Sequence, residues 1–404
     1  MGWDYMLLTP EAIPAYVAGT PRLAGLVDPA TLQVREVGDG NLNLVFVCRD
    51  ADGRGICLKQ SLPYVRLVGE SWPLTPHRAT AEARGYDAAA EWAPEFIPAW
   101  YGFDPDRFIL AMENLDHETI WRTALNEGLM HPGVEDDMGR YVARLAFYTS
   151  VFNLEQKELK GRIAASVNPE LCEITENLVF TEPYLDHDHN SWRPGVEPAV
   201  MELRHDERHV AEVNSLKVQF MTAAEALIHG DLHTGSVMVE MDGDRGHGKA
   251  IDSEFCFYGP VGFDLGALFG NYLAAMARAA ARGRPADFTG WVGGLVSGTW
   301  AAFEDEMRRL WPERSHRFLN DLYFEDWLLK MLRDGAGFGG CKAIRRIIGL
   351  AKVSDIETLD GDAHVAAATA VLRTGSRWIK ERHGFTSPSD LEEIARDVIG
   401  VEVG

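Results

Sequence analysis

The sequence predicts an α+β fold of two lobes, in which a lobe built on an antiparallel sheet precedes a larger, mainly helical lobe. Three observations carry this prediction. A chain of 404 residues exceeds the usual size of a single hydrophobic core. Its first part shows a hairpin pattern of alternating apolar residues, and helical periodicity dominates from residue 118 onward. We expect an N-terminal nucleotide-binding lobe over residues 1–113 and a C-terminal catalytic and substrate lobe over 114–404.

The composition indicates a globular protein without nucleic-acid or membrane partners. The hydrophobic fraction of 46% and charged fraction of 25% are ordinary, whereas the net charge of −22 is strongly acidic. Nucleic acids and anionic membranes attract basic patches, so this net charge argues against both as partners. The five cysteines are scattered without metal-ligand spacing, and no export signal or membrane-spanning run is present. We expect a reduced, cytoplasmic protein.

The N-terminal lobe opens with a short helix over 10–18 and a glycine-bearing hairpin. The expected strands, 32–37 and 42–48, flank the turn Gly38-Asp39-Gly40-Asn41. Backbone N–H groups of such a turn can approach phosphates closely, because glycine has no side chain in the way. The hairpin is therefore a candidate nucleotide-binding element.

The next strand, 56–60, carries Lys59 among alternating apolar residues. A lysine at this place can reach the α- and β-phosphates of a nucleotide, and it needs a carboxylate to hold it in position. Glu82, in the helical stretch 75–92, is the candidate partner. The alternative is that the two residues have no role at a nucleotide, with Lys59 exposed on its strand and Glu82 solvated on its helix.

Two later segments of this lobe can contact a ligand. Trp72 lies in a loop over 68–74, where its ring either caps a ligand or fills the core. Residues 107–115 form an apolar strand that runs into a polar connector, and the backbone at its end can read an adenine edge. The residues of this connector are Met112, Glu113, Asn114 and Leu115.

Three acids are the candidate catalytic and metal-binding groups. Asp231 follows an apolar pair in a His-Gly-Asp loop, and a strand further on carries Asp252 and Glu254. Alternating strand residues share a face, so we expect these two carboxylates to converge. Asp231 can accept the proton of an attacking hydroxyl, while Asp252 and Glu254 can hold Mg²⁺ against nucleotide phosphates. The alternative is a surface hairpin with ordinary acidic residues, which would leave three carboxylates unpaired beside apolar flanks.

Two further segments around these acids have more than one interpretation. Residues 243–250 fit the phosphate-loop spacing but end in Ala250, where Ser or Thr must bind Mg²⁺, so we expect a hairpin turn there. Asp264 either caps the following helix or braces the loop that contains Asp231.

Two adjacent arginines stand near the end of the chain. Residues 335–340 are rich in glycine and are expected to lead into a helix whose apolar stripe holds Ile344, Ile347 and Ile348. Arg345 and Arg346 fall off that stripe, so they form either a solvated face or a clamp for a substrate or a phosphate.

Several motifs of the chain resemble those of the 5-methylthioribose kinase family. The motifs that carry the resemblance lie in order along most of the chain, at 38–43, 68–75, 168–172, 229–236, 257–260 and 339–346. Aminoglycoside phosphotransferases and choline kinases share the His-Gly-Asp element but not the loop at 70–75 or the arginine pair. The resemblance implies a bilobal protein-kinase-like fold. It also implies ATP- and Mg²⁺-dependent phosphorylation of the anomeric 1-hydroxyl of S-methyl-5-thioribose in methionine salvage, by a homodimer.

Site residues carry over from the resemblance by position. Asp231 is similar to the catalytic aspartate, and Trp72, Arg345 and Arg346 match residues at the sugar and the transferred phosphate. The remaining matches are the nucleotide-binding residues 38–41, Asn43, Lys59 and Glu82, and the metal-binding residues Ser236, Asp252 and Glu254. One departure is visible, because Ser253 stands where the family usually has proline, which frees a backbone N–H and removes some stiffness.

Two other functions stay open at this stage. One is a kinase for a related small substrate, such as 5-deoxyribose or an aminoglycoside. The other is a pseudokinase that binds nucleotide without catalysis, although the joint presence of Lys59, Asp231, Asp252 and Glu254 argues against it.

Overall fold

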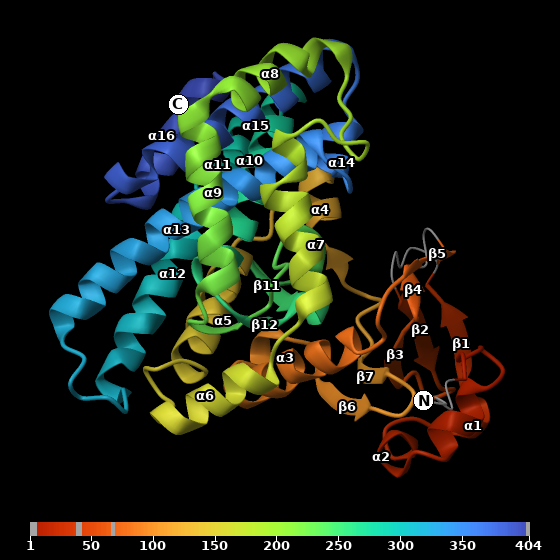
Figure 1. The fold of residues 1–404 in the computed structure, drawn as a ribbon. Helices are drawn as coiled ribbons and strands as arrows, with labels where there is room; N and C mark the ends of the chain where they lie inside the picture. Colours follow the sequence, from red (N-terminus) through yellow and green to blue (C-terminus); the bar gives the residue numbers. More distant parts are fainter. Residues whose placement is uncertain (1–5, 38–42, 66–68, 401–404) are drawn as a thin grey trace.

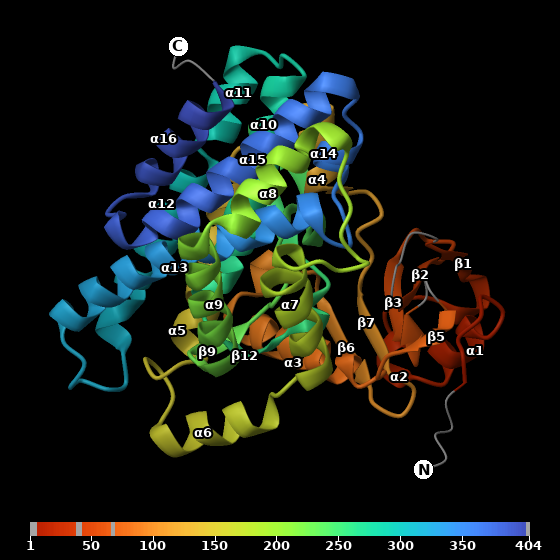
Figure 2. The same ribbon diagram turned by 45° about the horizontal axis from the view of Figure 1, so that its top comes forward.

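The N-terminal part of the protein is an antiparallel sheet of five strands in the order β1-β2-β3-β7-β6. The structure is a computed structural model and describes residues 6–37, 43–65 and 69–400. Figures 1 and 2 show this sheet on one side of the molecule and the long helices on the other, which confirms the predicted α+β fold. The strands are β1 (Gln33–Glu36), β2 (Asn43–Arg49), β3 (Gly55–Ser61), β6 (Trp100–Asp104) and β7 (Ile109–Glu113).

The two faces of the sheet are covered differently. Leu58 and Ile109 point to the face covered by the short helices α1 (Ile13–Ala18) and α2 (Pro21–Ala24). Lys59 alternates with Leu58 and therefore points to the opposite face, toward α3 (Arg78–Trp92). A two-stranded ribbon of β4 (Tyr64–Val65) and β5 (Gly69–Pro73) stands beside the sheet. Alternation along β3 thus directs Lys59 into the molecule.

The rest of the chain is mostly helical. We propose that the N-terminal lobe ends at residue 113, the last residue of β7. The helices that follow are α4 (Trp121–Glu127), α5 (Val134–Tyr148), α6 (Gln156–Ala165), α7 (Pro169–Phe180), α8 (Glu197–His205), α9 (Glu207–Thr222), α10 (Gly262–Ala281), α11 (Ala286–Gly293), α12 (Leu295–Leu310), α13 (Asp321–Ile348), α14 (Ser354–Glu357), α15 (Gly361–Glu381) and α16 (Pro388–Ile399). The strands are β8 (Thr119–Ile120), β9 (Ala226–Ile228), β10 (Val237–Asp242), β11 (Arg245–Ala250) and β12 (Phe257–Gly259).

The glycine-rich segment 335–340 lies inside α13, so the expectation that it leads into a helix is wrong. Glycine is normally unfavourable in a helix interior, but here it permits close approach of neighbouring helices. A Cβ atom on Gly266 of α10 would lie 2.6 Å from the amide nitrogen of Gly339, and one on Gly270 would lie 2.5 Å from the carbonyl oxygen of Gly339. On the other side of α13, Gly340 approaches the backbone of Gly375 in α15.

Three helices therefore pack with little between their backbones. α13 packs against both α10 and α15, which also contact each other. Among the described residues, none of the helices is long and apolar enough to cross a lipid bilayer.

We expect Gly270→Ala to destabilise the fold. The added methyl group would meet the backbone of α13, and overpacking of this kind typically lowers the free energy of unfolding by about 1–3 kcal/mol. Gly161→Ala in α6 is the matched control, because nothing lies within 4 Å of a Cβ there and alanine favours a helix. Urea unfolding of both variants measures the difference. Equal stability of the two variants would contradict the close packing.

Candidate active site

The loop that carries Asp231 is held by hydrogen bonds to its backbone. Asp264, in the first turn of α10, accepts the N–H of His229 at 2.7 Å and the N–H of Gly230 at 3.0 Å. Gly230 has a φ of 82°, and its Cα lies against the backbone of Phe255, so a side chain would fit poorly there. The interpretation of Asp264 as a brace is confirmed, and the capping alternative is wrong because its carboxylate makes no cap on α10.

The carboxylate of Asp231 is surrounded by nitrogen atoms. Its Oδ1 accepts a hydrogen bond of 2.5 Å from Lys342 Nζ and lies 4.0 Å from Nη2 of Arg345, while Oδ2 lies 3.3 Å from Nε2 of His233. Burial by itself would raise the pKa of Asp231, but the nearby Lys342 ammonium outweighs it and holds that pKa well below its ordinary value. Burial also lowers the pKa of His233 to about 3, so this imidazole is neutral near pH 7.

The predicted pairing of Lys59 with Glu82 is present. Lys59 Nζ donates to Glu82 Oε1 at 2.8 Å and to Asp252 Oδ1 at 2.7 Å. Burial disfavours the charged lysine, but the two carboxylates outweigh it and raise the pKa of Lys59 well above its ordinary value. Lys59 is thus a fixed positive charge between the sheet and the loop that carries Asp252.

Asp252 and Glu254 do not lie on a strand, so the strand argument for their shared direction is wrong. β11 ends at Ala250, Asp252 adopts a left-handed conformation with φ of 63°, and Ser253–Phe255 form a turn of 3-10 helix. The physical reason is the turn's close packing on α3, where Ser253 is buried and its hydroxyl lies 3.5 Å from the carbonyl of Glu82. A left-handed non-glycine residue is strained, and such strain is concentrated at functional sites.

The two acids have different surroundings. About half of the Asp252 side chain is exposed, with 49% accessible, whereas Glu254 is buried. Glu254 Oε2 accepts from Asn43 Nδ2 at 3.0 Å and from Arg78 Nε at 3.3 Å. Arg78 itself is fully buried and also donates to the carbonyl of Leu62 at 2.7 Å. Glu254 thus links the loop after β11 to α3 and β2.

Ser236 lies close to the same loop. Its hydroxyl is 3.1 Å from Nδ1 of His233, and its carbonyl accepts the N–H of Ile251 at 2.9 Å. This backbone hydrogen bond places Ser236 beside the residue that precedes Asp252. Asn168 supports the loop from the other side, because its side-chain amide donates to the carbonyl of Glu254 at 2.9 Å.

Arg345 and Arg346 are buried, so the alternative of a solvated face is wrong. Their exposed fractions are 7% and 9%. Arg346 donates to the carbonyl of Ala351 at 2.7 Å, and within the described part of the chain the buried Nε atoms of both arginines have no hydrogen-bond partner. Two unsatisfied guanidinium nitrogens beside Asp231 are suited to an anionic ligand.

The remaining nucleotide-binding candidates are only partly described. Residues 38–41 lie outside the described residues, and so does the side chain of Trp72, whose backbone belongs to β5. Met112 and Glu113 end β7 beside β3, and the buried Asn114 and Leu115 follow directly. The connector therefore begins on the sheet that carries Lys59.

The segment 243–250 is not a phosphate loop. Residues 245–250 form β11, paired with β10, so the turn is shorter than expected and no helix follows it. Lys249 donates instead to Glu113 at 3.1 Å and to Glu118 at 3.0 Å.

Lys342 and Arg78 also belong to the site, although neither was predicted from the sequence. Lys342 lies three and four residues before the two arginines, a spacing that puts all three on neighbouring faces of one helix. This spacing could have identified Lys342 from the sequence, but only if the glycine-rich segment had been expected to be helical. No local pattern marks Arg78, because its partners come from distant parts of the chain.

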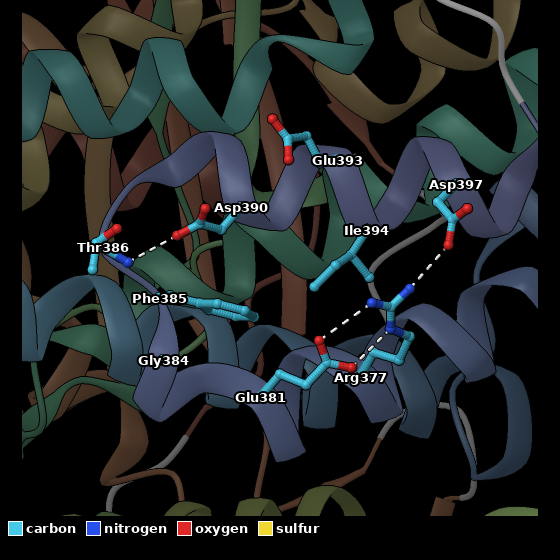
Figure 3. A pocket seen from close by; sticks show the side chains of 9 residues that line it. All are labelled: Arg377, Glu381, Gly384, Phe385, Thr386, Asp390, Glu393, Ile394 and Asp397. Atoms are coloured by element: carbon cyan, nitrogen blue, oxygen red, sulfur yellow. Dashed lines mark hydrogen bonds and ion pairs between the residues drawn. The ribbon is translucent and has the colours of Figure 1, made fainter.

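A separate hollow of about 520 Å³ lies between α15 and α16 (Figure 3). Arg377, on its wall, donates to Glu381 at 2.8 Å and to Asp397 at 3.0 Å, so its guanidinium is already paired. None of the candidate site residues lines it, and we assign it no part in the site.

We expect Arg78→Leu to destabilise the protein strongly. It would leave Glu254 buried without its cation, and breaking a buried ion pair in this way typically costs about 3–5 kcal/mol of unfolding free energy. Arg162→Leu is the control, because its pair with Glu158 is exposed and such pairs contribute about 0–1 kcal/mol.

Chemical denaturation of the double variant Arg78→Leu/Glu254→Leu completes the measurement. With no uncompensated charge left, it should recover much of the loss. A double variant that is less stable than Arg78→Leu alone would contradict this account of Glu254.

Comparisons with known proteins show which family the chain resembles. Residues 33–304 match the family described as "Phosphotransferase enzyme family". A protein of Geobacillus kaustophilus (strain HTA426) named methylthioribose kinase is 40% identical, over 95% of this chain and 96% of its own length. A methylthioribose kinase of Geobacillus thermodenitrificans (strain NG80-2) is also 40% identical, over 92% and 93%. Among solved structures, Plasmodium vivax ethanolamine kinase is similar with a TM-score of 0.46 at 12% identity, over 93% and 90% of the two chains.

Proposed function

The chain belongs to the phosphotransferase enzyme family and, within it, to the methylthioribose kinases, and on this premise we propose that it phosphorylates S-methyl-5-thioribose. The γ-phosphoryl group of ATP passes to the anomeric 1-hydroxyl, and S-methyl-5-thioribose 1-phosphate enters methionine salvage. The single observation that carries the proposal is the placement of the Asp231 carboxylate, whose loop is braced by Asp264 and which is faced by Lys342 and Arg345.

Asp231 receives the proton of the attacking hydroxyl. As the bond between the sugar oxygen and the γ-phosphorus forms, the bond from that phosphorus to the departing ADP oxygen breaks, and the hydroxyl proton passes to the carboxylate. The low pKa of Asp231, caused by its cationic neighbours against the effect of burial, keeps the carboxylate ionised at neutral pH. It is then ready to orient the hydroxyl for attack.

The nucleotide is held from the N-terminal side. Lys59, kept in place by Glu82, contacts the α- and β-phosphates, and the connector from Met112 to Leu115 contacts the adenine through its backbone. The hairpin residues Gly38, Asp39, Gly40 and Asn41, with Asn43, cover the phosphates. These assignments rest on the resemblance and, for Lys59 and Glu82, also on their hydrogen bond.

Asp252, Glu254 and Ser236 are the residues we assign to Mg²⁺. The donor chemistry fits, because all three offer oxygen atoms, which Mg²⁺ prefers, and Asp252 is half exposed. Both described contacts of Glu254 reach Oε2, so Oε1 is the atom we assign to the ion. When bound, the ion neutralises charge on the phosphates.

Arg345 and Arg346 stabilise the phosphoryl group during its transfer, and Trp72 covers the sugar. Charge spreads over the equatorial oxygens of the phosphoryl group, and guanidinium forks can meet two oxygens at once. Their buried, unsatisfied Nε atoms support this role. We also propose a homodimer located in the cytoplasm, on the resemblance alone.

The site chemistry favours this sugar kinase over the two alternatives. Aminoglycosides are polycations, and the buried cations Lys342, Arg345 and Arg346 around Asp231 would repel them. 5-Deoxyribose differs from methylthioribose only at the 5-position, so we expect it to be phosphorylated more slowly than methylthioribose. A pseudokinase would not need the ion pairs of Lys59 together with the braced Asp231.

The proposal is tested by offering acceptors side by side. Purified protein with Mg-ATP is incubated with methylthioribose, 5-deoxyribose, ribose and kanamycin, and the product is identified by ³¹P and ¹³C NMR. We expect the highest kcat/KM for methylthioribose and a phosphate on its anomeric oxygen. A higher kcat/KM for kanamycin, or no transfer to any acceptor, would overturn the assignment.

We expect Asp231→Asn to lower kcat by roughly 10²–10⁴, the usual contribution of a positioned general base. The amide cannot accept the hydroxyl proton, but nucleotide contacts stay intact, so ATP affinity measured by calorimetry should change little. Asp116→Asn is the control, because this aspartate pairs with Arg49 on the surface of the sheet lobe. A kcat within about threefold of the wild type would make Asp231 a structural residue only.

A further inference from the structure

Lys342 is a buried lysine whose role the phosphoryl-transfer chemistry above does not explain. Only 2% of it is exposed, and its Nζ donates to Asp231 Oδ1 at 2.5 Å and lies 5.0 Å from the ring centre of Phe263. Among the described residues, Asp231 is the carboxylate with which it forms an ion pair. Burying an ammonium group is costly, so a lysine in this place needs a specific function or a well-placed partner.

The geometry gives Lys342 control over the direction of the Asp231 carboxylate. Hydrogen bonds to Asp264 fix the backbone of the loop, but they leave the side chain of Asp231 free to rotate. Lys342 holds one carboxylate oxygen, and His233 lies 3.3 Å from the other. Two partners on two oxygens define the plane of the carboxylate, and they leave lone pairs for an incoming hydroxyl.

We propose that Lys342 is a positioning residue of the phosphoryl transfer, which holds the Asp231 carboxylate in the orientation that receives the hydroxyl proton of the acceptor. The inference rests on the proposed function of Asp231 and adds a residue that reaches it from α13. Lysine suits this role better than arginine, because a single ammonium occupies one oxygen, whereas a guanidinium fork would bind both.

The surroundings of Lys342 also make its charge sensitive to pH. The charged groups that face it are Asp231 in the loop, Asp264 on α10, and Arg345 and Arg346 on its own helix. Burial lowers the pKa of Lys342 to about 8, and the two arginines act in the same direction while Asp231 opposes them. Below this pH the ammonium holds the carboxylate, and above it the hold is lost. We therefore expect the kcat of the wild type to fall as pH rises through about 8.

The test compares Lys342→Met with Lys342→Arg across pH 6–10. We expect Lys342→Met to lower kcat at least about tenfold with ATP affinity nearly unchanged, and to lack the fall near pH 8. Lys342→Arg keeps its charge, so its kcat should be intermediate and should also lack that fall. Lys330→Met is the matched control, because Lys330 lies on the same helix and pairs with Asp334 at 2.5 Å, yet is 44% exposed.

A double variant separates positioning from an independent role. If Lys342 acts through Asp231, then Asp231→Asn/Lys342→Met should be no slower than Asp231→Asn alone. If the losses of kcat in the two single variants multiplied in the double variant, the proposal would be overturned. A Lys342→Met enzyme with the kcat and pH profile of the wild type would overturn it as well. If Lys342→Met does not fold, the pH profiles of the wild type and of Lys342→Arg decide instead. The double variant also serves, because asparagine replaces the buried, charged carboxylate that the loss of Lys342 would otherwise leave unpaired.

Failure of the proposed function gives a different result. If methylthioribose is not the acceptor, the wild type fails in the acceptor assay itself. The same variants are then compared by their slow hydrolysis of Mg-ATP, which needs no sugar but uses Asp231 toward water. A loss in Lys342→Met that is absent in Lys330→Met would still support the positioning role, and equal rates would overturn it.

Discussion

The close contact between α10 and α13 is the constraint on which the site depends. α10 carries Asp264, which braces the loop of Asp231, and α13 carries Lys342 and the two arginines that face the same carboxylate. Their relative position follows from backbones that nearly touch at Gly266 and Gly339. A side chain at Gly266 would meet the backbone of α13 and force the two helices apart, which would lengthen the hydrogen bond between Lys342 and Asp231.

Charge pairs connect the sheet lobe to the loop after β11. Lys59 reaches Asp252, and Arg78 with Asn43 reaches Glu254, so residues distant in sequence meet at both carboxylates. In an acidic protein of net charge −22, these buried cations are scarce and each is matched to an acid. Under the proposed function, a nucleotide with its metal must exchange partners with groups that are already paired, and its binding energy includes the loss of those pairs.

The fold and the clustering of several candidate residues could be predicted from the sequence, but their local geometry only in part. Lys59 could be placed toward Glu82 because the strand alternation around Lys59 and the helical pattern around Glu82 are both local and periodic. The same reasoning failed at Asp252, where packing of Ser253 on α3 ends the strand early. It also failed at α13, whose glycines are unfavourable in isolation and are compensated only by contacts with other helices.

That compensation couples the site to folding as a whole. Four glycines between 335 and 340 would each weaken an isolated helix by about 1 kcal/mol, so this half of α13 has little tendency to form alone. It acquires its shape only when α10 and α15 close around it. The cationic half of the site therefore depends on the packing of α10 and α15 against α13, and without that packing Lys342, Arg345 and Arg346 would have no fixed place around Asp231.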